Sequence, residues 1–438
     1  MGCPSADLTH YLSHGGADEG LLRLYGKTAL EEQKNRYQGL LAYARQRLGG
    51  RCSFLASAPG RTELGGNHTD HNNGRVVASA VDLDCVAAAV PTADNRVTLI
   101  SSDYPDPISI DLGSLAPKPG ERSSPESLIR GVAAARNKRG CAVPGFSAVL
   151  DSTCTPGTGL SSSAAFSVLM GGIFATLADE RPDPVRLARD GQFAENTYFG
   201  KPCGLMDQLS SAAGYTLGID FEDPANPLIT RIKTNFEDWG YRLLIIDTGG
   251  SHSDLTDDYA AVTGEIAQAA AILQRSKARG LSVEQVLQQV RPLRAGAGDR
   301  ALLRLLHFIT EDQRAAAQTD ALLQHDYDRF LELVRQSGSS SCTLLQNCSS
   351  SKNSREQGIL LAISLTSLLF PRAVCRVHGG GFAGTAQAYV PKDQFDDYHL
   401  LMERVFGERA VLPVLIGRPG FCFLGAEGWL FSDTGDTP

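Results

Sequence analysis

Residues 58–74 of the 438-residue chain, A-P-G-R-T-E-L-G-G-N-H-T-D-H-N-N-G, combine glycines with side chains that can bind polar ligands. Arg61, Asn67, His68 and Asp70 fall within ten residues of one another. Carboxylate and imidazole groups exchange hydrogen bonds with hydroxyls, and glycine lets the backbone approach a ligand closely. The stretch predicts a loop that binds a polyhydroxylated ligand, with a polar surface turn as the alternative.

Residues 156–165, P-G-T-G-L-S-S-S-A-A, form a second glycine-rich stretch, which runs into an apolar segment ending near Leu177. Backbone N–H groups, the positive end of a helix dipole and serine hydroxyls together make a cradle for phosphate. The stretch is not a Walker A loop, because no Gly-Lys-Ser/Thr follows. We expect a loop that opens a helix from Ser161 to Leu177. A serine N-cap on a small-residue helix is the alternative.

Two further stretches contain groups that could do chemistry. Residues 376–384, R-V-H-G-G-G-F-A-G, place a triglycine between two strand-like runs. It predicts either a tight hairpin or a backbone that approaches a nucleotide phosphate. Residues 194–208, A-E-N-T-Y-F-G-K-P-C-G-L-M-D-Q, contain Glu195 and Asp207, which taken alone are typical of ordinary surface carboxylates.

Apolar spacing predicts the elements that position these residues. We expect an N-terminal helical segment, then a strand-rich region, then helices and strands mixed without regular alternation. The expected helices are 30–48, 161–177, 260–278 and 301–334, the last ended by the polar stretch 337–341, and the expected strands lie within 76–90, 243–247, 374–390 and 410–424. This pattern favours an α+β protein of two domains that meet near residues 225–240.

Composition narrows the class of partner. A formal net charge of -8 argues against a nucleic acid, which would favour a basic surface. The ten cysteines include no C-x-x-C pair or zinc-type cluster, which predicts free thiols in a reducing cytoplasm. No apolar run approaches the roughly 18 residues of a membrane helix. We therefore expect a cytoplasmic protein without a membrane partner; the residues do not predict an oligomeric state.

The four stretches resemble a known family. Residues 60–74 are similar to the galactokinase signature G-R-V-N-x-I-G-E-H-T-D-Y-N-x-G, and 156–165 to the motif P-x-G-x-G-L-S-S-S-A. Residues 376–384 resemble T-G-G-G-F-G-G, and 194–208 resemble A-E-x-x-x-x-G-x-P-C-G-I-M-D-Q. Because the stretches follow the family's order, the chain resembles galactokinases, of the galactokinase, homoserine kinase, mevalonate kinase and phosphomevalonate kinase (GHMP) superfamily.

The resemblance implies the α+β, two-domain GHMP kinase fold. That fold has a ribosomal-protein-S5-like N-terminal domain and a ferredoxin-like C-terminal domain, with the active site in the interdomain cleft. On this basis we predict a helical lead-in at residues 1–50. The N-terminal domain, which carries the sugar and ATP motifs, is expected at 51–230 and the C-terminal domain at 231–438.

The resemblance also implies an ATP-dependent sugar 1-kinase with Mg²⁺. Asp207 matches the family's catalytic aspartate, which takes or orients the proton of the C1 hydroxyl, with Arg61 beside it holding its pKa low. Ser163 and Glu195 match the magnesium ligands. The residues that match sugar contacts are Asn67, His68, Asp70, Gly204 and Tyr259. The residues that match the ATP loop are Pro156, Gly157, Thr158, Gly159, Leu160, Ser161, Ser162 and Ser163.

Two departures affect the substrate. Asn67 replaces the Glu of G-E-H-T-D, which in the family contacts the sugar near C6, and His71 replaces a Tyr. D-galactose, giving galactose 1-phosphate and ADP, is the expected substrate. A neutral Asn67 tolerates a 6-carboxylate, so galacturonate is an alternative, as is N-acetylgalactosamine. A non-catalytic sugar and ATP sensor is a different alternative, against which Arg61, Glu195 and Asp207 all argue.

Overall fold

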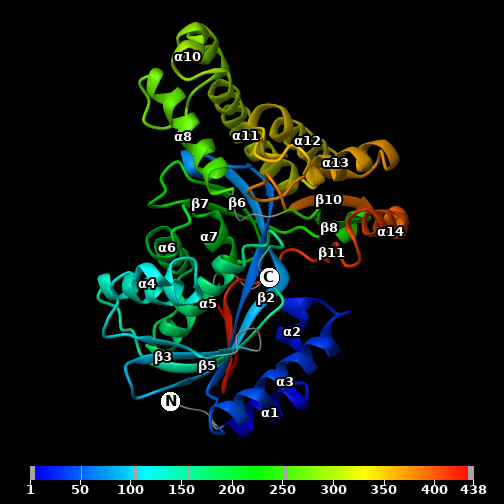
Figure 1. Cartoon of the computed structure of the whole chain (residues 1–438). Helices are drawn as coiled ribbons and strands as arrows, with labels where there is room; N and C mark the ends of the chain where they lie inside the picture. Colours follow the sequence, from blue (N-terminus) through cyan, green and yellow to red (C-terminus); the bar gives the residue numbers. More distant parts are fainter. Residues whose placement is uncertain (1–4, 51, 102–105, 156, 251–254, 433–438) are drawn as a thin grey trace.

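Two β-sheets organise the chain in the computed structural model, which describes residues 5–50, 52–101, 106–155, 157–250 and 255–432 (Figure 1). The larger sheet has the order β13-β12-β1-β2-β5-β3-β4, and β6 and β7 extend it from β2. Its strands are β1 (Phe54–Gly65), β2 (Arg75–Pro91), β3 (Arg96–Ser101), β4 (Ile108–Asp111), β5 (Phe146–Ser152), β6 (Thr216–Asp220), β7 (Leu228–Ile232), β12 (Cys422–Gly425) and β13 (Gly428–Phe431). The smaller sheet, β11-β8-β10-β9, consists of β8 (Tyr241–Asp247), β9 (Val374–Val377), β10 (Thr385–Pro391) and β11 (Val411–Val414).

β1 and β2 form a long antiparallel pair that carries the first glycine-rich stretch. The register between these strands shifts twice, between Pro59 and Arg61 and between Glu63 and Gly65. A β-bulge bends its strand and re-aims the neighbouring side chains. The two shifts therefore set the directions of Arg61 and Glu63, which both point into buried polar surroundings.

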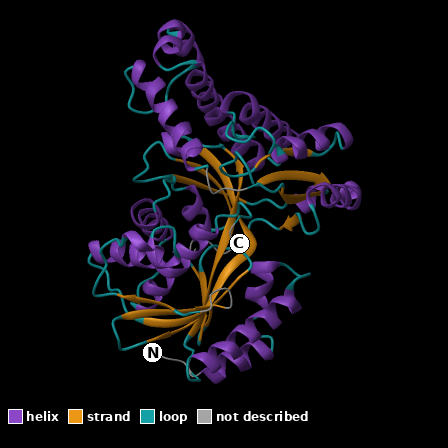
Figure 2. Cartoon of the chain, viewed as in Figure 1, coloured by secondary structure: helices purple, strands orange, loops and turns teal. Residues whose placement is uncertain are grey.

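Helices cover both faces of the larger sheet (Figure 2), which explains why its central strands are apolar on both sides. Because side chains alternate along a strand, Ala56 and Ala87 join the core with α4 and α5, whereas Leu55 and Val86 pack against α1 to α3. The helices of this part are α1 (Ser5–Ser13), α2 (Asp18–Tyr25), α3 (Leu30–Arg47), α4 (Pro125–Lys138), α5 (Ser162–Leu177), α6 (Pro184–Phe193) and α7 (Met206–Ala213).

The smaller sheet is also covered on both faces. Leu243 and Ile245 of β8 share a core with α12, whereas the alternate residues Leu244 and Ile246 pack with α13 and α14. A helical projection stands at the upper end of the molecule (Figure 1), with its own apolar core. The remaining helices are α8 (Thr256–Ile272), α9 (Val283–Gln288), α10 (Val290–Gly296), α11 (Asp299–Leu323), α12 (Tyr327–Ser340), α13 (Gly358–Leu369) and α14 (Phe395–Phe406).

Most of the expected elements are present. The helix expected at 161–177 is α5, and the buried strand expected at 243–247 is β8. The expected helix break at 337–341 is wrong, because α12 continues to Ser340 and then widens into a π-helical turn. The polar residue Ser337 is tolerated there because it is buried and donates a hydrogen bond to Glu311 of α11. Its local polarity therefore did not signal a loop.

The division of the chain at residues 50 and 230 stays a prediction. β7 lies across the second of these positions and pairs with β6 of the larger sheet. The C-terminal strand β12 returns to the larger sheet beside β1. The chain thus leaves the larger sheet after β7, builds the smaller sheet and the helical projection, and comes back.

Candidate active site

The glycine-rich loop before α5 has the backbone conformation of a ligand-binding turn. Gly157 and Gly159 have φ of 90° and 72°, which is the left-handed region that favours glycine. Ser161 is also left-handed, with φ of 58°, and α5 begins at the next residue. The first N–H groups of a helix have no partner within the helix, so the loop delivers donors at its end. Pro156 lies outside the described residues.

Gly159 packs against the strand that follows the triglycine. A Cβ at this position would lie 2.3 Å from Oγ1 of Thr385 and 2.8 Å from Nδ1 of His378. His378 Nε2 lies 3.0 Å from Oγ1 of Thr62, so the ring bridges two strands. Burial, and then Arg61, hold the pKa of His378 well below its usual range. The ring of His378 is therefore neutral and packs against the glycine-rich loop at Gly159.

Arg61, Asp207 and Ser161 meet beside this loop. Arg61 Nε donates to Oδ1 of Asp207 over 2.7 Å, and its Nη1 donates to the carbonyl oxygen of Gly159, also over 2.7 Å. Ser161 donates to the other oxygen of Asp207. The proximity of Arg61 and Asp207 that the family resemblance implied is confirmed. One carboxylate thus joins β1, the glycine-rich loop and α7.

The electrostatics of this cluster keep Asp207 ionised. Burial opposes ionisation, but Arg61, together with Lys201 and the hydrogen bond from Ser161, lowers the pKa of Asp207 to about 2. The Asp207 side chain keeps 18% of its surface exposed. A charged carboxylate with open surface and unused lone pairs can accept a hydrogen bond from a ligand hydroxyl.

Glu195 lies in a second polar cluster next to Asp207. It belongs to a π-helical turn, Ala194–Phe199, and accepts a hydrogen bond from Nε2 of Gln208 (3.0 Å), with Ser163 nearby. Lys201 Nζ lies 4.0 Å from its other oxygen. Burial is the main reason that the pKa of Glu195 is raised, and nearby Asp207 adds to it while Lys201 opposes it. A buried carboxylate of this kind gains stability from an added cation.

These residues fit the magnesium ion that the family implies. The described residues include no group of three His, Cys, Asp or Glu side chains that could cage a metal. Mg²⁺ in nucleotide-dependent enzymes, however, is commonly held by one or two carboxylates together with phosphate oxygens. The carboxylate of Glu195 and the hydroxyl of nearby Ser163 are hard oxygen donors that match that requirement.

Asp70 and Gly204 lie against each other, and His68 reaches the triglycine turn. A Cβ on Gly204 would lie 1.7 Å from Oδ2 of Asp70, so only glycine allows the two segments to approach this closely. Nε2 of His68 lies 2.9 Å from the carbonyl oxygen of Gly380 in the triglycine turn. Burial, and then His71, lower the pKa of His68 to about 3, so its ring is neutral at physiological pH.

Tyr259, the sugar-contact candidate with the fewest matching neighbours in the sequence, also reaches the triglycine turn. Its hydroxyl donates to the carbonyl oxygen of Gly381 over 3.1 Å, and a Cβ on Gly380 would lie 2.4 Å from its ring. The ring packs edge-on against Phe382. α8 therefore brings Tyr259 to the same turn that His68 contacts from the loop after β1.

Asn67 does not lie where a substrate contact was expected. It is fully buried, and its amide group donates to Glu63 (3.0 and 3.2 Å) and to the carbonyl oxygen of Gly379 (2.8 Å). Its Oδ1 accepts from Asn347 over 2.8 Å and from Ser341 over 3.4 Å. These bonds occupy both amide hydrogens and both acceptor positions, so the side chain has no free capacity for a ligand.

Two family models match parts of the chain that contain these residues. Residues 45–91 match the galactokinase galactose-binding signature, and residues 127–215 match the N-terminal domain of GHMP kinases. The first match contains Arg61, Asn67, His68 and Asp70, and the second contains the loop before α5 together with Glu195 and Asp207. The chain carries a galactokinase signature on a GHMP kinase fold. These matches support an ATP-dependent kinase that acts on a sugar hydroxyl.

Solved structures agree with the GHMP kinase fold. The structure of Lactococcus lactis galactokinase in complex with galactose is 22% identical, with a TM-score of 0.75 over 88% of this chain and 99% of that one. Mevalonate kinase of Methanococcus jannaschii is 14% identical, with a TM-score of 0.57 over 83% and 98%. Streptococcus pneumoniae phosphomevalonate kinase is 12% identical, with a TM-score of 0.55 over 82% and 98%. At these identities the likeness shows the fold, as predicted.

Sequence reasoning missed several polar residues of this candidate site. Glu63 and Arg376 form a buried ion pair beside Asn67, and Asn347 joins Asn67 to the triglycine turn. Gln208 donates to Glu195. Glu63 could have been noticed, because it stands where the galactokinase signature has Asn. Nothing local singles out Asn347, which lies 280 positions from its partner.

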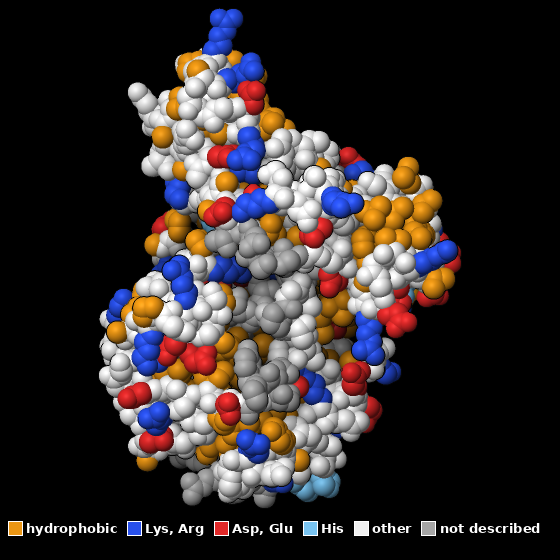
Figure 3. Space-filling model, viewed as in Figure 1, with side chains coloured by type: hydrophobic (Ala, Val, Ile, Leu, Met, Phe, Trp, Pro, Cys, Tyr) orange, Lys and Arg blue, Asp and Glu red, His pale blue; other side chains and the backbone are white. Residues whose placement is uncertain are grey.

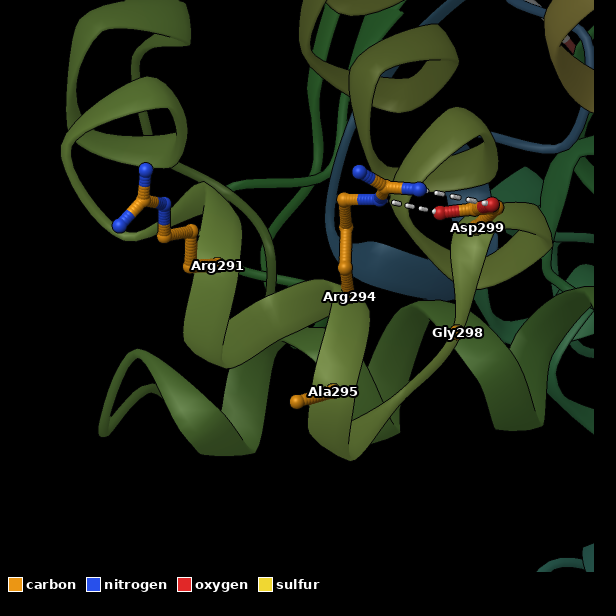
Figure 4. A pocket seen from close by; sticks show the side chains of 5 residues that line it. All are labelled: Arg291, Arg294, Ala295, Gly298 and Asp299. Atoms are coloured by element: carbon orange, nitrogen blue, oxygen red, sulfur yellow. Dashed lines mark hydrogen bonds and ion pairs between the residues drawn. The ribbon is translucent and has the colours of Figure 1, made fainter.

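The described surface has other features away from this cluster. A hollow at the tip of the helical projection is lined by Arg291, Arg294, Ala295, Gly298 and Asp299 (Figure 4), and an ion pair of 2.6 Å joins Arg294 to Asp299 at the helix ends. Hydrophobic side chains gather over α13 (Figure 3), where Leu361, Leu368 and Leu369 are exposed. Among the described residues, no helix is both long and apolar enough to cross a membrane.

Proposed function

We propose that the protein transfers the γ-phosphate of ATP to the anomeric hydroxyl of D-galactose. The observation that carries this proposal is the carboxylate of Asp207, held by Arg61 and Ser161 at the end of the glycine-rich loop. Phosphoryl transfer depends mostly on positioning and on stabilising charge, and this cluster offers both.

In the proposed reaction the anomeric oxygen bonds to the γ-phosphorus while the bond from that phosphorus to the ADP oxygen breaks. Asp207 accepts a hydrogen bond from the anomeric hydroxyl and takes its proton as the new ester forms. With a pKa of about 2, Asp207 is a weak base, so its main contribution is to orient the hydroxyl. Arg61 offsets negative charge on the transferred group while its bond to Gly159 fixes its direction.

We assign the phosphates of ATP to residues 156–163, of which Pro156 lies outside the described residues. Ser163 and Glu195 would hold Mg²⁺, which when bound neutralises charge on the phosphate oxygens. His68, Asp70, Gly204 and Tyr259 are proposed as sugar contacts. Because the ring of His68 is neutral, it presents one donor and one acceptor, as a sugar hydroxyl requires.

The alternative substrates have less support. The galacturonate alternative depended on a neutral Asn67 near C6 of the sugar. The amide group of Asn67, however, already forms hydrogen bonds with Glu63, Gly379 and Asn347. No observation favours N-acetylgalactosamine. The sensor alternative is weakened because Arg61, Ser161 and Asp207 are joined by hydrogen bonds as a working site requires. We also expect a cytoplasmic location, since the described cysteines are free thiols.

Release of ADP from ATP and Mg²⁺ tests the proposal, with D-galactose, D-galacturonate, N-acetylgalactosamine and D-glucose compared at equal concentration. Turnover that is greatest with D-galactose and lost in Asp207→Asn supports it. Asp328→Asn, an exposed helix position, is the matched control and should keep wild-type turnover. Greatest turnover with D-galacturonate moves the substrate, and no turnover with any of the four sugars supports the sensor.

A further inference from the structure

The triglycine turn between β9 and β10 is held by its carbonyl oxygens. Three consecutive glycine carbonyls accept hydrogen bonds from side chains of other elements. The donors are Asn67 to Gly379 (2.8 Å), His68 and Asn347 to Gly380 (2.9 and 3.1 Å), and Tyr259 to Gly381 (3.1 Å). Gly379 and Gly381 have φ of 64° and 79°, a conformation that few other residues adopt. The shape of the turn therefore depends on side chains that reach it from elsewhere.

Asn67 is the donor with the fewest alternatives. One amide hydrogen is shared between the two oxygens of Glu63 and the other binds Gly379, while Oδ1 accepts from Asn347. The side chain is 0% exposed, so water cannot replace a lost partner. A carboxylate at position 67 would lack both donors and would face Glu63 and the carbonyl oxygen of Gly379.

Glu63 balances the charge of Arg376 in the same buried region. The two side chains form an ion pair through Nη2 and Oε1, and neither is more than 3% exposed. Glu311 is a second acidic group whose charge acts on Arg376. The other terminal nitrogen, Nη1, has no hydrogen-bond partner among the described residues. Removal of the Glu63 charge would leave a buried guanidinium without its direct counter-ion, which is costly.

We propose that Glu63 and Asn67 are a compensated pair of positioning residues, in which Glu63 neutralises Arg376 and so frees Asn67 to hold the triglycine turn. The galactokinase signature that this stretch resembles has the opposite arrangement, with Asn at the first position and Glu at the second. In this chain the carboxylate stands at Glu63 of β1, four positions before the place of the family's Glu. Asn67 is then a support for the turn and not a contact for the sugar.

The hydrogen bonds from Asn67 that hold the triglycine turn, here called the clamp, act on the nucleotide side of the proposed active site. A Cβ on Gly379 would lie 3.8 Å from the carbonyl oxygen of Gly159, the same oxygen that accepts from Arg61. A shift of the turn would therefore press on the glycine-rich loop. This inference rests on the proposed function in taking that loop as the phosphate site, and it predicts that nucleotide affinity depends on Asn67.

Asn67→Asp tests the clamp by calorimetric titration with Mg²⁺·ADP, which needs no turnover. We expect affinity for ADP to fall at least about tenfold, the effect of one lost buried hydrogen bond, while affinity for D-galactose changes less than about threefold. Asn95→Asp, an exposed amide in the turn before β3, is the control and should bind both ligands normally.

The opposite pattern, weaker binding of D-galactose with unchanged binding of ADP, makes Asn67 a sugar contact and overturns the proposal. If wild-type protein binds ADP but no sugar, the proposed function fails while the ADP titration still tests the clamp. In active protein, the KM for ATP should rise more than the KM for D-galactose.

The reciprocal exchange tests the compensation, including the case in which Asn67→Asp does not fold. Glu63→Asn leaves Arg376 without its partner, and Asn67→Glu places two carboxylates beside it, so each should lower the melting temperature. The double variant Glu63→Asn/Asn67→Glu restores one carboxylate. It should melt at a higher temperature than either single variant, whereas a double variant that combines the losses of both single changes contradicts the compensated pair.

Discussion

Asp207 beside the glycine-rich loop and Asp84 beside the N-terminal helices make an instructive contrast. Asp207 contacts Arg61 from the nucleotide-loop side, and Asp84 of β2 pairs in register with Pro59, two residues before Arg61. In both cases burial opposes ionisation, and in both cases neighbouring arginines lower the pKa of the carboxyl below its usual value. Charge alone therefore does not tell a catalytic carboxylate from a structural one.

The difference lies in how many partners each carboxylate has. Asp84 is 0% exposed and accepts four side-chain hydrogen bonds. They come from Arg36 (2.8 Å), Arg418 (2.8 Å), Tyr25 (2.6 Å) and Ser57. Asp207 has one arginine and one serine, and 18% of its side chain is exposed. Asp84 ties the N-terminal helices to the sheet, whereas Asp207 retains capacity for a ligand.

Asp207→Asn should give the largest loss of activity. The neutral amide keeps the shape but loses the negative charge that attracts the anomeric hydroxyl and takes its proton. We expect kcat to fall about 10³-fold, with a melting temperature close to that of wild type. ADP-release rates and thermal unfolding of the same preparations measure both. A large fall in melting temperature would place Asp207 with Asp84 as a structural residue.

Asp84→Asn should give the largest loss of stability. It leaves the buried guanidinium groups of Arg36 and Arg418 without their shared counter-ion, at a cost of about 3–5 kcal/mol. Chemical denaturation measures the free energy of unfolding. The fraction that stays folded should keep the KM for ATP and for D-galactose. A normal unfolding free energy with altered KM values would reverse the contrast.

Arg61→Lys sharpens the account of the catalytic side. Lysine keeps the charge but cannot bind Asp207 and the carbonyl oxygen of Gly159 with the same planar fork. We expect kcat to fall about 10²-fold, because orientation is lost while some charge remains. Arg96→Lys, at an exposed position in β3, serves as the matched control. A wild-type kcat in Arg61→Lys would mean that a positive charge at this position supports the reaction without the orientation that the guanidinium hydrogen bonds supply.

Acid should weaken the wild-type fold through its buried neutral histidines. The pKa of His68 is lowered to about 3 in the folded protein, whereas an exposed histidine in the unfolded chain titrates near about 6.5. Below that value the unfolded state takes up a proton that the folded state refuses, so stability falls as the pH drops towards 3. The slope reaches about 1.4 kcal/mol per pH unit for one histidine. His68→Gln should show a shallower decline between pH 6.5 and 3, and an unchanged slope would contradict this assignment.

The sequence predicted the parts of this molecule that local chemistry decides. The helix at Ser162–Leu177 follows from a glycine-rich loop before small apolar residues, and β8 from a short apolar run. The proximity of Arg61 and Asp207 came from resemblance to a family and not from spacing, because 146 residues separate them. Motif and periodicity thus gave the local elements and the family gave the long-range pair.

The remaining features depend on tertiary contacts that no local pattern carries. Asn67 looks like a loop residue in sequence, yet it is buried because residues 341–347 and the triglycine turn close over it. The Glu63–Arg376 pair joins residues 313 positions apart. In the sequence, Asp84 interrupts the apolar pattern of a strand. Its burial in β2 is explained by Tyr25 and Arg36 of the N-terminal helices, which donate hydrogen bonds to its carboxylate.

The central claim, that this site phosphorylates a sugar at its anomeric hydroxyl, is tested most directly by phosphorus NMR of the product. D-galactose, ATP and Mg²⁺ incubated with the protein should yield one phosphate ester whose phosphorus couples to the anomeric proton, and Asp207→Asn should yield about 10³-fold less in the same time. An ester on another carbon, or equal product from Asp207→Asn, would contradict the account.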